Sequence, residues 1–365
     1  MRNWDAIIIG AGIIGVSLAI ELSKRRLRVL VVDKGEPGRE ASWAAGGMLA
    51  DFPLEMAPAL LELATASARM YPEFVHELQD ESGLKIDLRS QGTLVLILEP
   101  ELRPVLAGHS PATTRSSALP RALAELEPAL RLSDNLASPL TALFLKERSV
   151  DPRHVTVAAI AAARHRGIDF SSGDQVLAVE VSNGKASGVR TNKTQFAAGI
   201  VVNCAGAWAG QIGSGSLPVR PVKGQMLCVV MPEKELVRHV IRTPDVYLIP
   251  RSDGRMLIGA TAEEAGFDKQ TIPETIQKLR KAALDLVPKL AEARFLQAWA
   301  GLRPGTPDKL PILGATSTPG YFVAGGHFRD GILLAPITAK VMAELITGQR
   351  PQIDLSKFLP ARFID

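Results

Sequence analysis

The sequence predicts an α/β protein with two parts: a parallel sheet built from separated segments of the chain, and an α+β part with a large antiparallel sheet. Three observations lead to this prediction. Near the N-terminus, an apolar run is followed by a glycine-rich turn and a helical pattern of apolar residues. A similar apolar run and glycine-rich turn recur at residues 321–331. Between them, residues 219–261 alternate between apolar and polar residues, as antiparallel strands do.

The N-terminal segment has the order strand, turn, helix, strand, acid. Residues 6–9 form an unbroken apolar run, typical of a buried parallel strand. Gly10, Gly12 and Gly15 follow, and the apolar residues then recur at helical spacing through residue 22. A second apolar run, residues 29–32, ends at Asp33. Together these features predict a Rossmann-like dinucleotide-binding unit.

Each residue type in this unit has a physical reason. Gly10 allows a tight turn, Gly12 lets backbone amides approach a pyrophosphate, and Gly15 lets the helix pack closely on the sheet. The pyrophosphate is then expected at the helix N-terminus, where free N–H groups and the helix dipole favour negative charge. Asp33, at the end of the next strand, is placed to hold a pair of ribose hydroxyls. A signal peptide is the alternative for uncharged residues 6–20, but the glycine pattern and Asp5 disfavour it.

Composition and charge narrow the class of protein. The chain has 365 residues and a formal net charge of +4, with basic residues scattered along it. No run of basic residues indicates nucleic acid, and no apolar stretch reaches the ~20 residues of a membrane span. Cys204 and Cys228 both lie in apolar runs, which favours buried thiols over a disulfide or a metal pair. We expect a cytoplasmic homo-oligomer that binds neither nucleic acid nor a membrane.

The first half of the chain continues with less regular patterns. Residues 34–52 are predicted to form a loop of small residues that approaches a flat, large partner. Residues 54–82 are predicted to form two helices broken near Pro72. Residues 92–98 are predicted to form a strand, and residues 99–145 the helices and turns of a second domain.

The second half is more regular. Asp151 and Pro152 predict the N-cap and first residue of a helix that continues to His165. Asn183 and Gly184 predict a hairpin turn. A buried strand over residues 200–204 leads into a second glycine-rich turn, residues 272–292 are predicted to form one or two helices, and a strand at 321–324 precedes a helix at 332–347. We therefore expect one domain from residues 1–86, 146–217 and 320–365, and another from 87–145 and 218–319.

Six motifs carry a resemblance that extends over nearly the whole chain. They lie at residues 10–15, 42–49, 202–208, 221–225, 301–304 and 325–336. With them the chain resembles the FAD-dependent amino-acid oxidases of the D-amino-acid oxidase superfamily, and within it the bacterial glycine oxidases of thiamine biosynthesis. The last motif, Gly-His-Phe-Arg-Asp-Gly-Ile-Leu-Leu-Ala-Pro from Gly326, is the most specific.

The resemblance implies FAD as the cofactor, with the loops at 44–49 and 325–334 around the isoalloxazine. The helix that begins near Ile332 would point its positive end at the flavin edge where negative charge develops on reduction. Gly301 stands where similar sarcosine oxidases carry a flavin-linked cysteine, so a non-covalent flavin is expected. The residues expected to bind the cofactor are Gly10, Gly12, Ile13, Ile14, Gly15, Asp33, Lys34, Ser42, Ala45, Gly46, Gly47, Met48, Leu49, Val176, Cys204, Ala205, Gly206, Trp208, Gly301, His327, Phe328, Arg329, Asp330, Gly331, Ile332 and Leu333.

Three residues are candidates for the substrate. Arg303 is expected to bind the substrate carboxylate with its planar fork, because its setting is too apolar and too tightly turned for a surface arginine. Tyr247 matches the family's carboxylate-binding tyrosine, with an ordinary sheet tyrosine as the alternative. Arg329 is expected near the substrate or in closure of the flavin loop, with an ion pair to Asp330 as the alternative.

The remaining polar candidates have weaker roles. In the family's mechanism hydride passes directly to the flavin, so no side-chain base is needed, and His327 is expected to shape its loop. Lys223 is expected to orient the sheet over the flavin face, with oxygen activation as a lesser alternative. The other histidines, His76, His109, His154, His165 and His239, have no metal-ligand spacing, and no metal is expected.

One departure concerns substrate size. The chain has Ala262 where glycine oxidases of this type would have a bulkier methionine, which leaves more room beside the substrate's α-carbon. The sequence therefore predicts oxidation of glycine or another small amino acid to the imine and then the oxo acid, with release of ammonia and reduction of O2 to hydrogen peroxide. The alternatives are a broader D-amino-acid or sarcosine-type oxidase, a quinone-linked D-amino-acid dehydrogenase, and a non-redox FAD-binding subunit. A hydrolase is excluded because no Gly-x-Ser-x-Gly motif is present.

Overall fold

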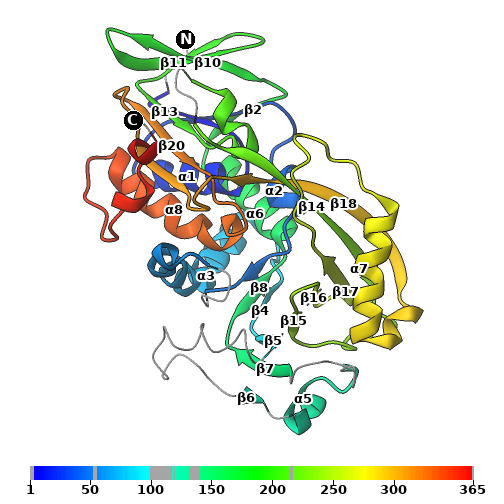
Figure 1. The fold of residues 1–365 in the computed structure, drawn as a ribbon. Helices are drawn as coiled ribbons and strands as arrows, with labels where there is room; N and C mark the ends of the chain where they lie inside the picture. Colours follow the sequence, from blue (N-terminus) through cyan, green and yellow to red (C-terminus); the bar gives the residue numbers. More distant parts are fainter. Residues whose placement is uncertain are drawn as a thin grey trace.

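Two sheets organise the computed structural model, which describes residues 4–51, 56–98, 117–118, 120–131, 140–213 and 217–363. One sheet has six strands in the order β19-β20-β13-β1-β2-β9, and the other has eight in the order β18-β14-β17-β16-β15-β5-β7-β6. Figure 1 shows the first sheet among the helices α1, α3, α6 and α8, and the second reaching away from them towards α7. The α/β prediction with a second, antiparallel part is confirmed.

The six-stranded sheet carries the glycine-rich turns. Its strands β1, β2, β9, β13 and β20 run parallel, and β19 pairs antiparallel to β20 at one edge. Their bounds are β1 (Ala6–Ile9), β2 (Val29–Asp33), β9 (Asp169–Ser172), β13 (Ile200–Asn203), β19 (Ile312–Ala315) and β20 (Tyr321–Gly325). Because parallel strands end at the same edge, the turns after β1, β13 and β20 lie together there.

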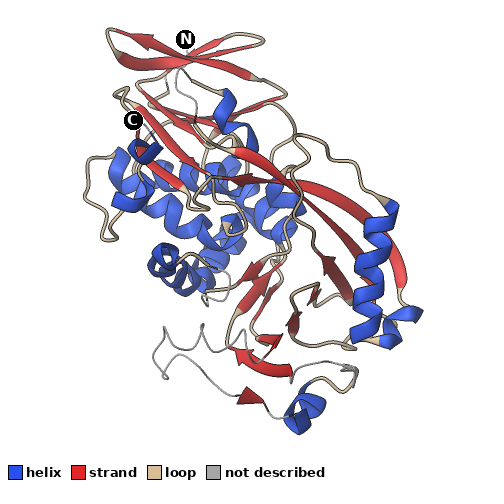
Figure 2. Ribbon diagram, viewed as in Figure 1, coloured by secondary structure: helices blue, strands red, loops and turns tan. Residues whose placement is uncertain are grey.

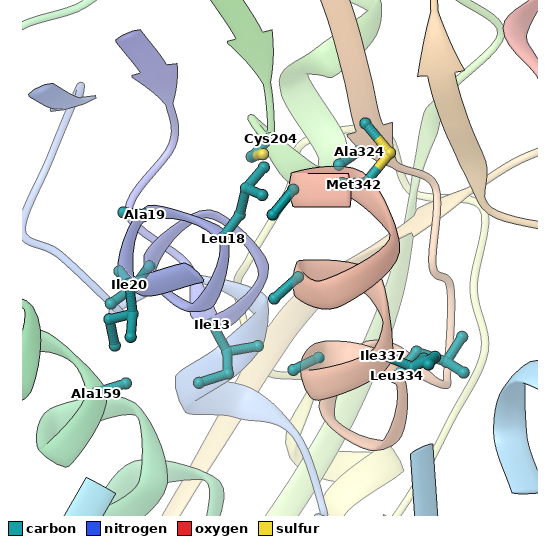
Figure 3. Close-up of a cluster of buried hydrophobic side chains, with 14 of the residues drawn as sticks. Ile13, Leu18, Ala19, Ile20, Ala159, Cys204, Ala324, Leu334, Ile337 and Met342 are labelled. Carbon is teal, nitrogen blue, oxygen red and sulfur yellow. The ribbon is translucent and has the colours of Figure 1, made fainter. Parts of the chain in front are cut away.

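This sheet is buried on both faces, which explains its unbroken apolar runs. Ile8 faces a core formed with the helices α1 (Ile13–Lys24), α3 (Leu61–Ser82), α6 (Pro152–His165) and α8 (Gly331–Ile346). Its neighbour Ile7 faces the opposite core, formed with the small sheet of β10 (Val176–Ser182), β11 (Lys185–Thr191) and β12 (Gln195–Ala197). Figure 3 shows the helical core, in which Leu18 of α1 and Met342 of α8 lie near Cys204 and Ala324.

The eight-stranded sheet has a helix-covered face and a second face that lines a cavity. Leu279 and Ala283 of α7 (Pro273–Leu286) pack against Leu227 and Ile258 on the first face. A short 3-10 helix, η3 (Pro288–Glu292), follows α7. The strands are β5 (Thr93–Leu98), β6 (Ser117–Ala118), β7 (Leu140–Leu145), β14 (Arg220–Val230), β15 (Val240–Arg242), β16 (Tyr247–Pro250), β17 (Arg255–Gly259) and β18 (Arg294–Gly305).

Figure 2 shows short strands and helices between and around the two sheets. The strands β3 (Met48–Leu49), β8 (Arg148–Val150) and β4 (Leu88–Arg89) form a small sheet in that order. The remaining short helices are α2 (Ala41–Ala44), α5 (Pro120–Leu126), η1 (Pro58–Leu60), η2 (Gly206–Gln211), η4 (Ser356–Phe358) and η5 (Pro360–Phe363).

Several predicted elements are confirmed. Helix α6 begins at Pro152, and the carboxylate of Asp151 accepts hydrogen bonds from the backbone N–H groups of Arg153 (2.9 Å) and His154 (3.4 Å). The hairpin between β10 and β11 turns at Asn183 and Gly184, both with positive φ. Both cysteines are buried free thiols.

The predicted break near Pro72 is wrong, because α3 continues through this residue. A proline in a helix leaves the carbonyl four residues earlier without its N–H partner. That carbonyl belongs to Ala68, and it accepts a hydrogen bond from Nη1 of Arg148 at 3.4 Å. Tyr71 also ties the helix to α8 by donating its hydroxyl to the Ile332 carbonyl at 2.6 Å. Tertiary contacts therefore keep the helix continuous.

Two other predictions need correction. Residues 34–52 contain α2 and β3 as well as loop, and residues 140–145 form a strand, β7, where helices and turns were expected. Residues 99–116, 119 and 132–139, with His109, lie outside the described residues. The division into two domains stays a proposal; β19, which lies in the second predicted domain, pairs with β20 of the first.

Candidate functional site

A cavity of about 1100 Å³ extends from the glycine-rich turns of the six-stranded sheet to the open face of the eight-stranded sheet. It exceeds the ~300–1,000 Å³ typical of small-molecule sites. At one end it is lined by residues that follow β1, β2 and β13, and at the other by residues of β14, β16 and β18. This shape fits a long ligand together with a smaller one.

The glycine-rich turn after β1 is held by side chains from two other segments. A Cβ at Gly10, whose φ is +105°, would collide with the carbonyl of Cys204. The carboxylate of Asp33 accepts hydrogen bonds from the N–H groups of Ala11 (2.7 Å) and Gly35 (2.8 Å). Ser42 accepts one from the first helical N–H, that of Ile13, at 3.0 Å. Asp33 and Ser42 therefore fix the turn where an anion is expected.

At the other end of the cavity, Arg303 of β18 and Tyr247 of β16 approach each other across two intervening strands. The two side chains lie close enough for the phenol to raise the pKa of the guanidinium, and the Tyr247 hydroxyl donates to Sδ of Met226 at 3.6 Å. Each lies over a glycine: a Cβ at Gly224 of β14 would collide with the Arg303 guanidinium, and a Cβ at Gly259 of β17 would lie 2.8 Å from the Tyr247 ring. The two glycines provide the space in which the cation and the phenol meet.

Backbone oxygens orient Arg303. Its Nη1 donates to the carbonyl of Thr261 at 2.9 Å and to that of Lys223 at 3.4 Å. Burial lowers the pKa of the Arg303 guanidinium, and nearby Arg329 lowers it further, whereas Tyr247 raises it. Arginine nevertheless stays protonated at neutral pH. A partly buried, oriented guanidinium beside a phenol hydroxyl is a site for a carboxylate.

The loop between β20 and α8 covers the same cavity. Arg329 lies in this loop with its guanidinium 5.5 Å from the centre of the Phe328 ring. His327 is 3% exposed, and its Nε2 is 3.0 Å from the Thr338 hydroxyl. Burial lowers the pKa of His327 to about 3, so the imidazole is neutral at neutral pH. It lies where it can shape the loop.

Residues 5–345 match the family described as FAD dependent oxidoreductase. The chain belongs to this family. A glycine oxidase from Pseudomonas aeruginosa is 34% identical over 97% of this chain and 98% of its own length. The hydrogen cyanide synthase subunit HcnC of the same organism is also 34% identical, over 99% of this chain and 97% of its own length. The crystal structure of glycine oxidase from Geobacillus kaustophilus, 32% identical, superimposes with a TM-score of 0.93 over the whole of both chains.

The cavity of this oxidoreductase fits FAD. Among the predicted cofactor residues, Gly15, Leu49 and Leu333 do not line it and are buried behind its wall; all the others line it. At Gly47, with φ +79°, a Cβ would collide with the Val150 carbonyl. At Gly301 a Cβ would collide with Ala44. These glycines let neighbouring segments of the cavity wall pack closely against each other.

Two predictions about the site are corrected. Arg303 lies within the twelve-residue strand β18, where a tight turn was expected. Lys223 does not line the cavity: Val222, Gly224 and Met226 of β14 do, so the Lys223 side chain lies on the opposite face of the sheet. It is 1% exposed and donates to Asp268 at 2.5 Å. Lys223 is therefore not placed to activate oxygen in this cavity.

Sequence reasoning missed several residues of the site. Gly224 and Gly259 are recognised only from the register of neighbouring strands. Arg251, which directly follows β16, is 1% exposed and donates Nη2 to the carbonyl of Gly46 at 2.5 Å. Burial lowers the pKa of Arg251 to about 10. Ala262 lines the cavity, as expected for a residue beside the substrate.

In the described part of the chain, no group of three or more histidine, cysteine or acidic side chains could hold a metal ion. No helix within the same residues is long and apolar enough to cross a membrane.

Proposed function

We propose that this oxidoreductase oxidises glycine or another small amino acid. The observation that carries the proposal is that Arg303 and Tyr247 face each other in the cavity that fits FAD. A protein that only binds FAD has no use for a carboxylate site facing the cofactor. The near full-length similarity to glycine oxidases supports the same activity.

In this proposal the protein's own residues bind and orient the substrate. Arg303 binds its carboxylate through two N–H groups, Tyr247 donates its hydroxyl to the same carboxylate, and Arg329 closes the site. Holding the carboxylate at one end fixes the direction of the Cα–H bond, which is the main contribution to the rate. FAD supplies the acceptor for the hydride at N5 and the route of the two electrons to O2, which becomes hydrogen peroxide. The imine then hydrolyses to the oxo acid and ammonia.

No side-chain base is required when the amine is bound neutral. His327, with a pKa of about 3 because of burial, is a weak base, and its Nε2 is engaged with Thr338. This supports a reaction in which the hydride leaves Cα without proton abstraction by a side chain.

Ala262 supports a wider substrate range than glycine alone. A methyl group at this position of the cavity wall leaves space for a substrate side chain or an N-methyl group. D-Alanine, D-proline and sarcosine are therefore part of the proposal, which extends to a D-amino-acid or sarcosine-type oxidase.

A second candidate is a dehydrogenase that passes electrons to a quinone or to a partner subunit. The similarity to HcnC, named as a subunit of hydrogen cyanide synthase, favours it. Both candidates use the same Arg303 site, and they differ in the electron acceptor. We also propose a homo-oligomer, which light scattering on the purified protein tests.

Anaerobic reduction of the bound flavin distinguishes these proposals. The FAD-loaded protein is mixed without oxygen with glycine, sarcosine, D-alanine, D-proline or L-alanine, and the flavin absorbance is followed. Fast bleaching by glycine and rapid return of the colour with peroxide in air supports a glycine oxidase. Faster bleaching by D-alanine or D-proline supports the wider range, and bleaching without reoxidation in air supports the dehydrogenase. Absence of bleaching by all five rejects amino-acid oxidation.

A further inference from the structure

Lys223 presents a buried charge that the proposed reaction does not use. Its side chain is 1% exposed on the face of β14 away from the cavity, and its ammonium donates to Oδ2 of Asp268 at 2.5 Å. Asp268 itself is 46% exposed. A buried ammonium without a partner is strongly destabilising, so Lys223 holds Asp268 in place.

Asp268 belongs to a stretch that we call the bridging segment, residues 261–271, which runs from the end of β17 towards α7. Its first half is tied to β14 by several hydrogen bonds. The N–H and carbonyl groups of Lys223 and Glu263 exchange two hydrogen bonds of 2.9 Å. Gln225 forms further hydrogen bonds: its N–H donates to the Thr261 hydroxyl (2.9 Å) and its side-chain amide donates to Glu263 (2.8 Å). Its side-chain oxygen accepts from the N–H of Ile272 at 2.7 Å, just after the segment. The Lys223–Asp268 pair holds the part of the segment between Glu263 and Ile272.

The bridging segment carries part of the carboxylate site. The carbonyl of its first residue, Thr261, accepts the 2.9 Å hydrogen bond from Arg303, and the carbonyl of Lys223 accepts the longer one. The next residue, Ala262, lines the cavity. The orientation of Arg303 therefore depends on where β14 holds the bridging segment.

The second half of the bridging segment reaches the six-stranded-sheet side of the molecule. The ring of Phe267 lies 5.2 Å from that of Trp208, which lines the cavity. Lys269 forms an ion pair with Glu40 at 3.1 Å, just before α2. Asp268 lies between these two contacts in sequence, so its bond to Lys223 sets the position of both.

We propose that Lys223 and Asp268 form a positioning pair: the buried ammonium fixes the bridging segment, and through the Thr261 carbonyl it fixes the angle at which Arg303 meets the substrate carboxylate. This inference rests on the proposed carboxylate site. Neither residue touches the substrate. A displacement of the Arg303 guanidinium by a fraction of an ångström weakens carboxylate binding, because a bidentate contact tolerates little misalignment.

The test compares Asp268→Asn and Lys223→Met in the FAD-loaded protein. Titration with propionate, a carboxylate without an amine, gives a dissociation constant from the change in flavin absorbance and needs no turnover. Both variants are expected to raise this constant and the KM for the best amino acid by about tenfold, with kcat changed less than twofold. The double variant is expected to resemble the singles, since both remove one interaction. FAD content per chain is expected to match that of the unmodified protein.

A matched control is available in α7. Lys281 and Asp285 form an exposed lysine–aspartate pair at 2.6 Å, remote from the cavity, and Asp285→Asn is expected to change neither constant. If Lys223→Met fails to fold, the propionate dissociation constant of Asp268→Asn alone tests the positioning role. A dissociation constant within twofold of the unmodified protein for Asp268→Asn overturns the positioning role.

The outcomes separate this inference from the proposed function. One outcome is that propionate binds, that Asp268→Asn weakens this binding, and that no amino acid bleaches the flavin. This outcome supports the positioning pair and rejects amino-acid oxidation. If propionate does not bind the unmodified protein, the positioning pair is rejected, whereas amino-acid oxidation is still decided by flavin bleaching. Lys223→Arg, which keeps the charge, is expected to recover part of the propionate affinity that Lys223→Met loses.

Discussion

Gly224 of β14 lies directly under the guanidinium of Arg303, at a position where any Cβ would collide with Nη1, Nη2 and Cζ of that group. The carboxylate site thus depends on the absence of a side chain two strands away from Tyr247. This relationship gives the first prediction.

Gly224→Ala is expected to displace Arg303 and raise the KM for the substrate at least tenfold, because a methyl group takes the volume that the guanidinium occupies. FAD binding is expected to be unaffected. Steady-state kinetics and the flavin content per chain check both statements. Gly199→Ala is the control, since a Cβ there meets nothing within 4 Å. Equal kinetics for the two variants would contradict this account of the site.

Arg303→Lys is expected to lower kcat/KM roughly 30-fold or more, because lysine cannot form the bidentate contact. This factor corresponds to a loss of about 2–5 kcal/mol of binding free energy. Arg303→Ala is expected to lose at least as much while the protein stays yellow. The comparison of the two variants separates loss of charge from loss of the planar fork. Unchanged KM in both would remove Arg303 from the site.

Ala262→Met is expected to narrow the substrate range. A longer side chain on the cavity wall fills space beside the substrate's α-carbon, so kcat/KM for D-alanine is expected to fall about tenfold or more relative to that for glycine. The ratio of the two kcat/KM values, measured in one preparation, is the observable. A ratio that does not change would show that Ala262 lies away from the substrate side chain.

His327 predicts a dependence of stability on pH. Burial lowers its pKa in the folded protein to about 3, below the ~6.5 of an unfolded chain. Between these values the unfolded state binds the proton and the folded state does not, so this residue reduces stability as the pH falls from about 6.5 towards 3 and has no effect above that window. His327→Gln, which keeps a donor for Thr338, is expected to lose less thermal stability between pH 6.5 and 4. Melting temperatures of both proteins over this range test it.

Local signals explain which parts of the fold were predictable. The glycines after β1, the acid at the end of β2 and the N-cap at Asp151 act within a few residues of their own position, so the sequence specifies them directly. Whether α3 continues through Pro72 depends on Arg148, about eighty residues later in the chain, and no local sequence pattern contains that information.

In the site, too, local motifs were predictable from the sequence and tertiary contacts were not. Arg303 and Tyr247 were recognised through their motifs, but the contact between them depends on strand order and on Gly224 and Gly259. For Lys223 the alternating pattern of β14 gives two possible faces, and only the packed structure selects the one away from the cavity. Side-chain direction across a sheet is a tertiary property, and a slip of one residue reverses it.

Strand β18 carries both Gly301, which packs against Ala44 of the cofactor loop, and Arg303. Two residues of extended chain span about 7 Å, so a single stiff segment sets the spacing between the cofactor and the group that binds the carboxylate. This fixed distance matches the part that all amino acids share, the carboxylate and the α-carbon. Ala262 lies on a different segment of the cavity wall, so a substitution there leaves the distance between Gly301 and Arg303 unchanged. Substrate preference can therefore drift in this fold while the geometry of the reacting bond is preserved.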